Sequence, residues 1–185
     1  MDHRVCPWWL GPLLANPLRK LVQDPRRILS PFVSAGMTAL EPGPGMGFFT
    51  LELARLVGPR GRVVAVDVQP RMLDGLRRRA ERAGVLGRVD LRIAPPSGLG
   101  VPDLAGRVGF VLAFAMVHEL ADPAAFFSEA AAALVAGGRL LLAEPGGHVS
   151  EQAFAATLRA ASLAGLRSQA GPVVWRSRTA LLVRE

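Results

Sequence analysis

The sequence has little cysteine and no long apolar run. Cys6 is the only cysteine among 185 residues, so no intramolecular disulfide can form and nothing indicates an oxidising compartment. Prolines and charges interrupt every apolar stretch before it reaches the roughly 20 residues that a membrane-spanning helix needs. The apolar segment WWLGPLLANPL contains two prolines and has neither a charged leader nor a small-residue cleavage site. The sequence therefore predicts a cytoplasmic protein without a transmembrane segment.

Lysine is also scarce, and this weakens the positive charge as a sign of nucleic-acid binding. The net charge is +7, with 22 Lys+Arg against 15 Asp+Glu, but Lys20 is the only lysine. This usage is typical of a GC-rich genome that places arginine on solvated faces. The densest basic cluster, residues 77–84, falls on one predicted helix and has no interleaved aromatic residues that could stack on bases. A nucleic-acid partner is therefore not favoured.

Short apolar runs alternate with segments of helical spacing along the chain. Half of the residues are hydrophobic and a fifth are charged, as in a globular domain. Strands are expected at 37–41, 62–68, 89–93, 108–116 and 139–144, with two further β-like runs at 172–175 and 179–183. Helices are expected at 48–57, 70–83, 123–135 and 150–164. The alternation predicts right-handed βαβ crossovers and an α/β fold with a doubly wound, mostly parallel sheet.

Residues 1–36 precede the first predicted strand and contain short helical patterns. They are expected to form an N-terminal helical cap on a single globular domain that covers residues 37–185. Trp8 and Trp9 could close an apolar lid over a small substrate, pack the cap on the domain, touch a membrane surface or form the face of a homodimer. His3 and Cys6 could contribute to a soft-metal site, but a single cysteine does not define one, so no metal is predicted.

A glycine-rich loop, EPGPGMG at residues 41–47, separates the first predicted strand from the first predicted helix. Glycine permits positive φ and lets a ligand touch the main chain, while the next helix presents free N–H groups and the positive end of its dipole. The spacing G-x-G-x-G differs from the G-x-G-x-x-G that places a pyrophosphate on a helix. Glu41 would repel a pyrophosphate and attract an ammonium group. The loop therefore favours a ligand with a cationic amino-acid end.

Asp67 ends the second predicted strand, about 20 residues beyond the glycine loop, where an acidic side chain can accept hydrogen bonds from both ribose hydroxyls. The alternatives are an ordinary glycine turn and an aspartate that caps a helix. Together, and in this order on these elements, the loop and Asp67 predict a site for a nucleoside that carries an amino-acid tail.

Four segments, LEPGPGMG, VVAVDVQPRML, FVLAFAMVHEL and LVAGGRLLLAEP, together resemble the motifs of the class I S-adenosylmethionine-dependent methyltransferases. The resemblance covers about residues 35–185. The combination of NPLR, ILSPFV, PGPGMGFFT, VHEL and EPGGHVS also resembles a subgroup of small prokaryotic enzymes of this type. The resemblance implies S-adenosylmethionine as the cofactor and a seven-stranded Rossmann-like sheet that ends in an antiparallel hairpin, which the two final β-like runs match.

The resemblance also implies which residues contact the cofactor. The glycine loop would cradle its methionine part, Asp67 would hold the ribose, and Met72 would pack against the adenine or serve as a core residue. The chain departs from the family pattern after the third strand, where APPSG leaves Ser97 or the main chain to meet the adenine amino group, and at Gly109, where many members have aspartate. The expected cofactor residues are Glu41, Gly43, Pro44, Gly45, Gly47, Asp67, Val68, Met72, Ser97 and Ala113.

Methyl transfer requires alignment of the acceptor with the methyl group, and a base if the acceptor must lose a proton. His118 and Glu119 follow the fourth predicted strand, and Glu144 and His148 follow the fifth, so two imidazoles could line one pocket. Histidine titrates near neutrality and suits a general base. His118 and His148 are therefore the candidate catalytic residues, the alternative being that each only orients a neighbour or lies on the surface.

The favoured function is S-adenosylmethionine-dependent methyl transfer to a small or moderately hydrophobic small-molecule acceptor. An RNA or protein methyltransferase is an alternative that the charge suggests, although the chain lacks the Asn/Asp-Pro-Pro-Tyr type of motif and has no tyrosine. A non-catalytic cofactor-binding module is a further alternative, because of the APPSG departure. The acceptor atom is left open.

Overall fold

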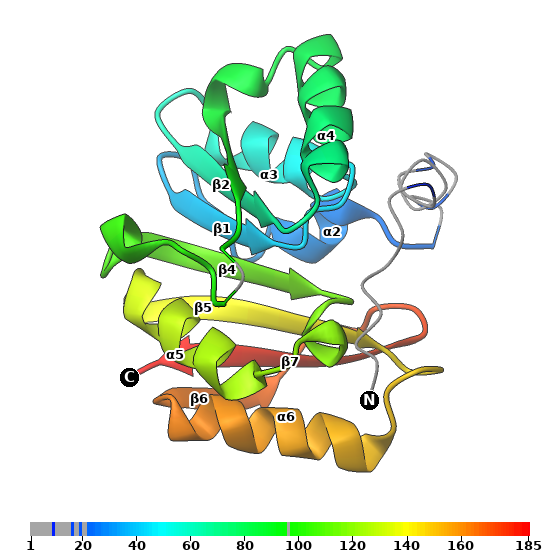
Figure 1. The fold of residues 1–185 in the computed structure, drawn as a ribbon, viewed down its shortest axis with the longest axis vertical. Helices are drawn as coiled ribbons and strands as arrows, with labels where there is room; N and C mark the ends of the chain where they lie inside the picture. Colours follow the sequence, from blue (N-terminus) through cyan, green and yellow to red (C-terminus); the bar gives the residue numbers. More distant parts are fainter. Residues whose placement is uncertain (1–8, 10–15, 17–18, 20–21, 96) are drawn as a thin grey trace. The chain divides into compact units, whose positions relative to one another are not determined.

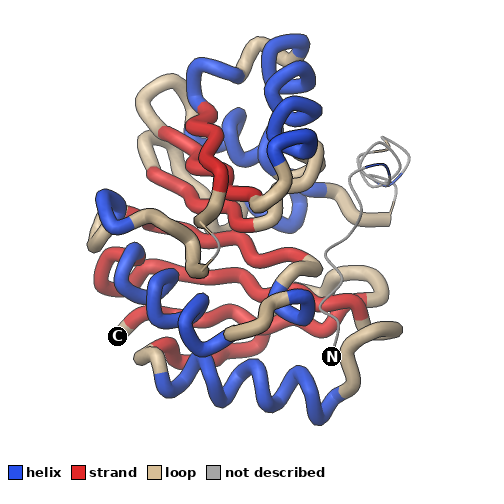
Figure 2. The backbone as a smooth tube through the Cα atoms, in the orientation of Figure 1, coloured by secondary structure: helices blue, strands red, loops and turns tan. Residues whose placement is uncertain are grey.

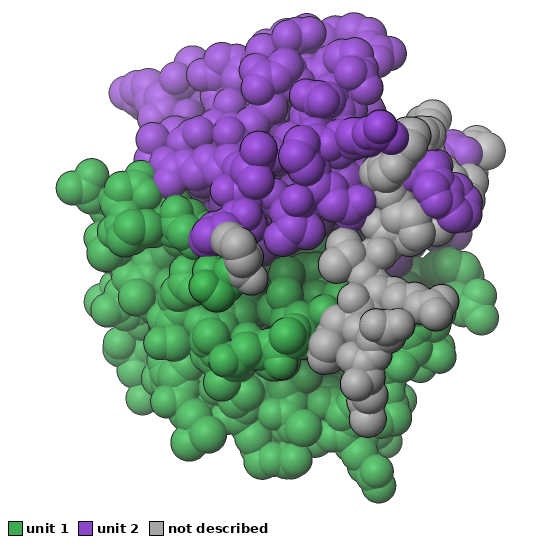
Figure 3. Space-filling model, viewed as in Figure 1, with its two compact units in different colours: residues 1–5, 97–185 green, residues 6–96 purple. Residues whose placement is uncertain are grey.

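The computed structural model describes residues 9, 16, 19, 22–95 and 97–185. The chain divides into two compact units, one formed by residues 6–96 and the other by residues 97–185 together with residues 1–5 (Figure 3). The boundary at residue 96 falls inside the segment predicted as one methyltransferase domain. We call residues 6–96 the glycine-loop unit and residues 97–185 the histidine unit. No helix in the described part of the chain is long and apolar enough to cross a membrane.

The glycine-loop unit contains three parallel strands and the helices that connect them. Its strands are β1 (Thr38–Pro42), β2 (Arg62–Asp67) and β3 (Val89–Ile93), and its helices are α2 (Pro25–Leu29), α3 (Thr50–Val57), α4 (Pro70–Arg82) and η3 (Leu86–Arg88). β2 pairs with β1 and with β3, in parallel on both sides. Pro70 begins α4, where its missing N–H costs nothing. Leu73 and Leu76 on α4 pack with Ala65 of β2 in one buried cluster.

The histidine unit contains the other four strands. Its strands are β4 (Val108–Phe114), β5 (Leu134–Pro145), β6 (Leu166–Ala170) and β7 (Ser177–Arg184), and its helices are η4 (Pro102–Leu104), η5 (Val117–Glu119), α5 (Pro123–Ala133) and α6 (Glu151–Leu163). β4 and β5 are parallel, whereas β7 is antiparallel to both β5 and β6. As the sequence predicts, α6 begins after Ser150, whose hydroxyl accepts a hydrogen bond from Ala153 N–H at 3.1 Å.

The strand order is β3-β2-β1-β4-β5-β7-β6, and Figures 1 and 2 show the strands with their connecting helices. The α/β prediction of a doubly wound, mostly parallel, seven-stranded Rossmann-like sheet is confirmed. Leu140, Leu141 and Leu142 of β5 are fully buried, as expected for a strand with both faces covered. The closing hairpin formed by β6 and β7 is also as expected.

Two predicted strand boundaries are wrong. The β-like run at 172–175 is not a strand, and β6 lies earlier, at Leu166–Ala170. Only Leu166 of that strand is buried, so this edge strand shows no apolar alternation in the sequence. β5 begins at Leu134, which pairs with Val108, and the register then shifts so that Phe110 pairs with Arg139. Gly137 and Gly138, which lie between the predicted helix at 123–135 and the predicted strand at 139–144, are therefore part of β5, in an irregular stretch.

Most of the predicted cap, residues 1–36, lies outside the described residues, including His3, Cys6 and Trp8. Within its described part, α2 begins after Asp24, whose side chain accepts a hydrogen bond from Arg26 N–H at 2.9 Å. The guanidinium of Arg19 lies 4.4 Å from the ring centroid of Phe48, the residue that follows the glycine loop. Trp9 is exposed. The role of the cap stays a prediction.

Candidate functional site

The glycine loop follows β1 and has the left-handed backbone that its composition predicts. Gly45 has φ of +55°, and a Cβ placed there would meet no described atom within 4 Å. Gly47 has φ of +84°, and a Cβ there would collide with the Leu76 side chain. Arg79 on α4 donates a hydrogen bond to the Met46 carbonyl at 2.8 Å and so ties the loop to that helix. The main chain at Gly45 is therefore open to a ligand, whereas at Gly47 both the left-handed φ and the Leu76 side chain disfavour a residue with a Cβ.

Glu41 lies at the end of β1, immediately before the loop, and its side chain is almost completely buried. The residue is 4% exposed, and within the described part of the chain neither its Oε2 nor Oγ1 of Thr50 has a hydrogen-bond partner. The pKa of Glu41 is raised to about 7, mainly by burial; the nearby Thr50 hydroxyl opposes the rise, and the negative charge of Asp67 adds to it. A buried carboxylate oxygen without a partner is costly, so this atom is suited to a cationic donor from outside the protein.

Asp67 ends β2 and is 7% exposed. Its Oδ1 accepts a hydrogen bond from Gln69 N–H at 2.9 Å, just before α4. This bond orders the turn before the helix but does not cap it, because Gln69 is the N-cap residue of α4 and no side-chain capping bond is present there. Val68 beside it is exposed, whereas Met72 is buried on α4, where a core methionine would also lie.

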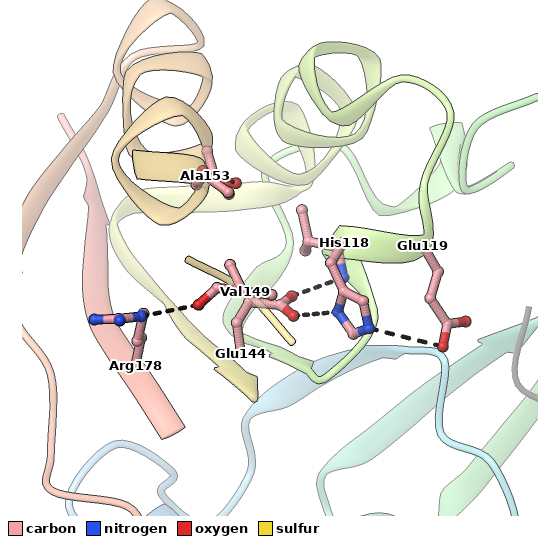
Figure 4. Close-up of polar contacts among 8 residues, drawn as sticks. His118, Glu119, Glu144, Val149, Ala153 and Arg178 are labelled. Atoms are coloured by element: carbon pink, nitrogen blue, oxygen red, sulfur yellow. Dashed lines mark hydrogen bonds and ion pairs between the residues drawn. The ribbon is translucent and has the colours of Figure 1, made fainter. Parts of the chain in front are cut away.

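The histidine unit holds a different arrangement of ionisable groups (Figure 4). Glu144, the penultimate residue of β5, is 1% exposed, and both of its oxygens have partners. Oε1 accepts a hydrogen bond from Val117 N–H at 2.8 Å, and Oε2 is hydrogen-bonded to Nδ1 of His118. This bond raises the pKa of His118, partial burial opposes the rise, and the negative charges of Glu144 and Glu119 add to it. The structure therefore joins His118 and Glu144, which the sequence named separately.

The two candidate histidines lie near each other but differ in their partners. Their ring centroids are 6.5 Å apart and the rings are almost perpendicular. His148 lies on the turn after β5, where its N–H donates to the Pro145 carbonyl at 3.0 Å, and its side chain is exposed. The next residue of this turn, Val149, is tied to β7, because Arg178 Nε donates to its carbonyl at 3.0 Å (Figure 4).

Two features of the histidine unit have no simple signal in the sequence. Ala115, directly after β4, has φ of +54°, which is uncommon for a residue with a Cβ, and its N–H donates to the Ala143 carbonyl at 2.7 Å. This bond holds the turn that leads to His118 against β5. Glu129 on α5 accepts hydrogen bonds from the N–H groups of Leu99 and Gly100 at 2.9 and 3.3 Å, which fixes the segment after Ser97.

The remaining expected cofactor residue of this unit, Ala113, is fully buried inside β4 and pairs with Leu142. Ser97 is exposed. Among the described residues, no cluster of three or more His, Cys, Asp or Glu side chains could hold a metal ion.

A protein-family model described as a methyltransferase domain matches residues 40–142, more than half of the chain. The chain belongs to the class I S-adenosylmethionine-dependent methyltransferase family. The match begins within β1 and includes the glycine loop and β2, together with β4 and most of β5. It therefore covers Glu41, Asp67 and His118 and ends just before Glu144.

Curated members of the methyltransferase family resemble parts of the chain. Ribosomal protein L11 methyltransferase of Pelotomaculum thermopropionicum is 36% identical over 140 residues, which are 75% of this chain and 42% of that protein. A ubiquinone/menaquinone biosynthesis C-methyltransferase of Escherichia coli is 37% identical over 71 residues, which are 38% of this chain and 28% of that protein. The matched part of the chain thus spans less than half the length of these relatives.

Solved methyltransferase structures share the fold. A SAM dependent methyltransferase from Aquifex aeolicus has a TM-score of 0.84 at 23% identity and covers 97% of this chain and 98% of its own. A geranyl diphosphate C-methyltransferase from Streptomyces coelicolor, in complex with S-adenosyl-L-homocysteine, has a TM-score of 0.61 at 20% identity, with coverage of 79% and 58%. At these identities the likeness concerns the fold.

The residues of the glycine-loop unit fit the cofactor of this methyltransferase family. S-adenosylmethionine carries an ammonium group on its methionine part, and that group can donate to Oε2 of Glu41, which accepts no hydrogen bond from any described residue. The methionine part of the cofactor can approach the open backbone at Gly45. Its ribose hydroxyls can donate to the carboxylate of Asp67 at the end of β2.

Proposed function

We propose that the protein transfers a methyl group from S-adenosylmethionine to a small or moderately hydrophobic acceptor. The buried Oε2 of Glu41, which has no hydrogen-bond partner in the part of the chain that the structure describes, carries this proposal together with the open main chain at Gly45. The family membership supplies the cofactor, and the geometry of Glu41 supports retention of cofactor binding in this chain. The contacts proposed within the glycine-loop unit are Glu41 to the ammonium of the cofactor, the glycine loop to its methionine part, Asp67 to its ribose and Met72 to its adenine; Val68, Ser97 and Ala113 stay predictions.

Exposed apolar side chains in the histidine unit support a hydrophobic acceptor. Val173 is 101% exposed and Trp175 is 54% exposed on the segment between β6 and β7. That segment adjoins the carboxyl end of β5, because Pro145 pairs with Ser177 and Gly146 N–H donates to the Arg176 carbonyl at 2.9 Å. Ligands of α/β sheets bind beyond the carboxyl ends of the strands. An acceptor near His118 or His148, the proposed candidate bases, would therefore have apolar surface close by.

A calorimetric titration tests the cofactor part of this proposal. The protein is titrated with S-adenosylmethionine, S-adenosylhomocysteine and NAD in separate experiments. Binding of the first two without binding of NAD is the expected result. Absence of binding of both sulfur compounds would overturn the proposal. Formation of S-adenosylhomocysteine with a panel of small acceptors then separates a catalyst from a non-catalytic binding module.

A protein acceptor is the second candidate function. The observation that favours it is the likeness to a ribosomal protein L11 methyltransferase over 75% of this chain. The test is transfer of a labelled methyl group to purified ribosomal proteins, with the small-acceptor panel run in parallel.

A further inference from the structure

We propose that Glu144 is a positioning residue that holds His118 with its Nε2 as the general base, and that the acceptor is therefore an acidic hydroxyl of the phenol or enol class. This inference rests on the proposed methyl transfer, and it deepens it by naming the acceptor's chemistry. It also distinguishes between the two candidate histidines, since His118 has a buried carboxylate partner and the described contacts of His148 are those of an exposed turn residue.

The contacts of Glu144 determine which nitrogen of His118 carries a proton. An ionised carboxylate only accepts hydrogen bonds. Oε1 of Glu144 already accepts from Val117 N–H at 2.8 Å, so its Oε2 accepts from Nδ1–H of His118. In the neutral imidazole the proton on Nδ1 leaves Nε2 with a free lone pair. Glu144 thus selects the tautomer in which Nε2 is the basic atom.

The position of Glu144 makes it a fixed partner. The residue lies in β5 between two strands, pairing with Arg178 of β7, and its side chain is 1% exposed. The bond from Ala115 N–H to the Ala143 carbonyl holds the following turn against the same strand. Ala115 has an uncommon positive φ in the turn that places His118 next to Glu144. Backbone strain of this kind is often found at functional sites.

The other titratable groups that face His118 leave Nε2 available. Oε1 of Glu119 on η5 lies 4.0 Å from Nε2, which is too long for a hydrogen bond but close enough to favour a positive charge on the ring. The ring of His148, on the turn after β5, lies 6.5 Å away between centroids. Three quarters of the His118 side chain is buried, since 25% is exposed, so one part of the ring can still meet an acceptor.

The proton transfer can be written with its atoms balanced. The acceptor O–H bond breaks and its proton forms the new N–H bond at Nε2 of His118, while the oxygen electron pair forms the O–CH3 bond. The methyl donor supplies an electrophilic carbon, and its S–CH3 electron pair remains on sulfur. Glu144 stabilises the resulting imidazolium as an ion pair, and the proton leaves to solvent after the product departs.

The strength of the base defines the acceptor class. Histidine has an ordinary pKa of about 6.5, and the bond to Glu144 raises the pKa of His118, so this base is well matched to a hydroxyl like the tyrosine phenol, whose pKa is about 10. A thiol, with a pKa of about 8.5, ionises to a useful extent without a base. A neutral amine is already nucleophilic. The histidine–glutamate pair is therefore of most use to a phenol or enol.

Nuclear magnetic resonance of the full-length protein tests the positioning role without cofactor or acceptor. The chain has three histidines, and His118→Asn assigns the signal of interest. We expect the neutral ring of His118 to be protonated at Nδ1 and its pKa to fall in Glu144→Gln. Glu119→Gln is the matched control, because it removes a charge near the same ring without removing the Nδ1 partner; its effect should be smaller. A neutral ring protonated at Nε2, or a larger effect of Glu119→Gln, would overturn the proposal.

Kinetics test the acceptor class. In the wild type the rate should rise with pH through the His118 pKa, because the neutral ring is the active form. Glu144→Gln should move this acidic limb to lower pH and reduce kcat on the order of 10²-fold, with KM for the methyl donor unchanged, and Glu144→Asp should restore part of the rate. In an acceptor panel, phenols should be methylated in preference to anilines and aliphatic alcohols. Preference for anilines would overturn the acceptor class.

These outcomes are distinguishable from failure of the proposed function. Calorimetry with S-adenosylmethionine reports the cofactor site independently of His118. If Glu144→Gln does not fold, the tautomer of wild-type His118 alone decides the positioning role.

Discussion

Two buried glutamates stand near the carboxyl ends of parallel strands, and they differ in what satisfies them. Glu41 of β1 is 4% exposed and its Oε2 has no partner among the described residues. Glu144 of β5 is 1% exposed and both of its oxygens are hydrogen-bonded, to Val117 N–H and to His118. Two glutamates in similar places therefore differ in their hydrogen bonding: one carboxylate oxygen of Glu41 accepts no bond from a described residue, whereas both oxygens of Glu144 accept one.

This difference indicates two kinds of role. Burial without partners disfavours the charged form of a carboxylate, so Glu41 is costly to the fold until a donor arrives. A carboxylate that already accepts two hydrogen bonds has little to offer a ligand but can fix its neighbour. We therefore expect changes at Glu41 to alter cofactor affinity with little loss of stability, and changes at Glu144 to alter the chemical step and the stability together.

The largest effect is expected at Glu144. Glu144→Ala leaves Val117 N–H unpaired and frees the His118 ring, so kcat should fall by on the order of 10²- to 10⁴-fold, the usual contribution of a general base. The free energy of unfolding should also fall by about 1–3 kcal/mol. Urea unfolding and steady-state kinetics measure the two. Glu41→Ala should show no such loss of unfolding free energy without ligand. Equal destabilisation by the two substitutions would contradict the proposed difference between the two glutamates.

The second effect concerns the pH dependence of stability. The pKa of Glu41 is raised from 4.5 to about 7 in the fold, so the fold favours the protonated carboxyl. The contribution of Glu41 to the free energy of unfolding is fully present below the pKa of the unfolded chain. It is lost as pH rises through about 7, by about 3 kcal/mol in total. Unfolding free energies measured from about pH 4 to about pH 9 should fall accordingly.

The His118 pKa, also raised, gives a pH slope of the same sign, so variants are needed to separate the two groups. Glu41→Gln should remove most of the slope, while Glu144→Gln should remove the part due to His118. A slope that survives in Glu41→Gln would show that its carboxyl is not the group responsible.

The third effect is on cofactor affinity. Glu41→Gln replaces the charged acceptor of the cofactor ammonium with a neutral one, and hydrogen bonds to charged groups contribute about 1.5–3 kcal/mol. The dissociation constant for S-adenosylmethionine should therefore rise by about 10- to 100-fold in calorimetry. Glu52→Gln is the control, because Glu52 lies in the first turn of α3, after the glycine loop, and is paired with Arg55 at 3.1 Å. Similar weakening in both variants would argue for a general charge effect.

The smallest effect is expected at Asp67. One of its oxygens already accepts from Gln69 N–H, so only part of its capacity serves a ribose. Asp67→Asn should weaken cofactor binding by about tenfold or less, since a single hydrogen bond contributes about 1 kcal/mol. Asp90→Asn on β3, which breaks an ion pair with Arg92, should leave the affinity unchanged. No change in Asp67→Asn would limit the role of Asp67 to ordering the turn before α4.

Local patterns predicted most of the glycine-loop unit. The range 89–93 is the observed β3, α4 begins at the predicted Pro70, and the loop after β1 has the left-handed glycines that its sequence requires. The Ser150 cap of α6 was equally predictable. Each of these features depends on residues that are close in the sequence, where backbone preference and side-chain periodicity act directly.

The sequence by itself determined the alternation of strands and helices, the position of the glycine loop and the acids at the ends of β1 and β2. Only the tertiary structure decided how the acids are used: Glu144 meets His118 across 26 positions of the chain, Glu129 meets Leu99 across 30, and Oε2 of Glu41 has no hydrogen-bond partner among the described residues. Edge strand β6 was likewise decided by pairing with β7. The physical reason is that hydrogen bonds between distant residues depend on which strands become neighbours, and no local propensity encodes that choice.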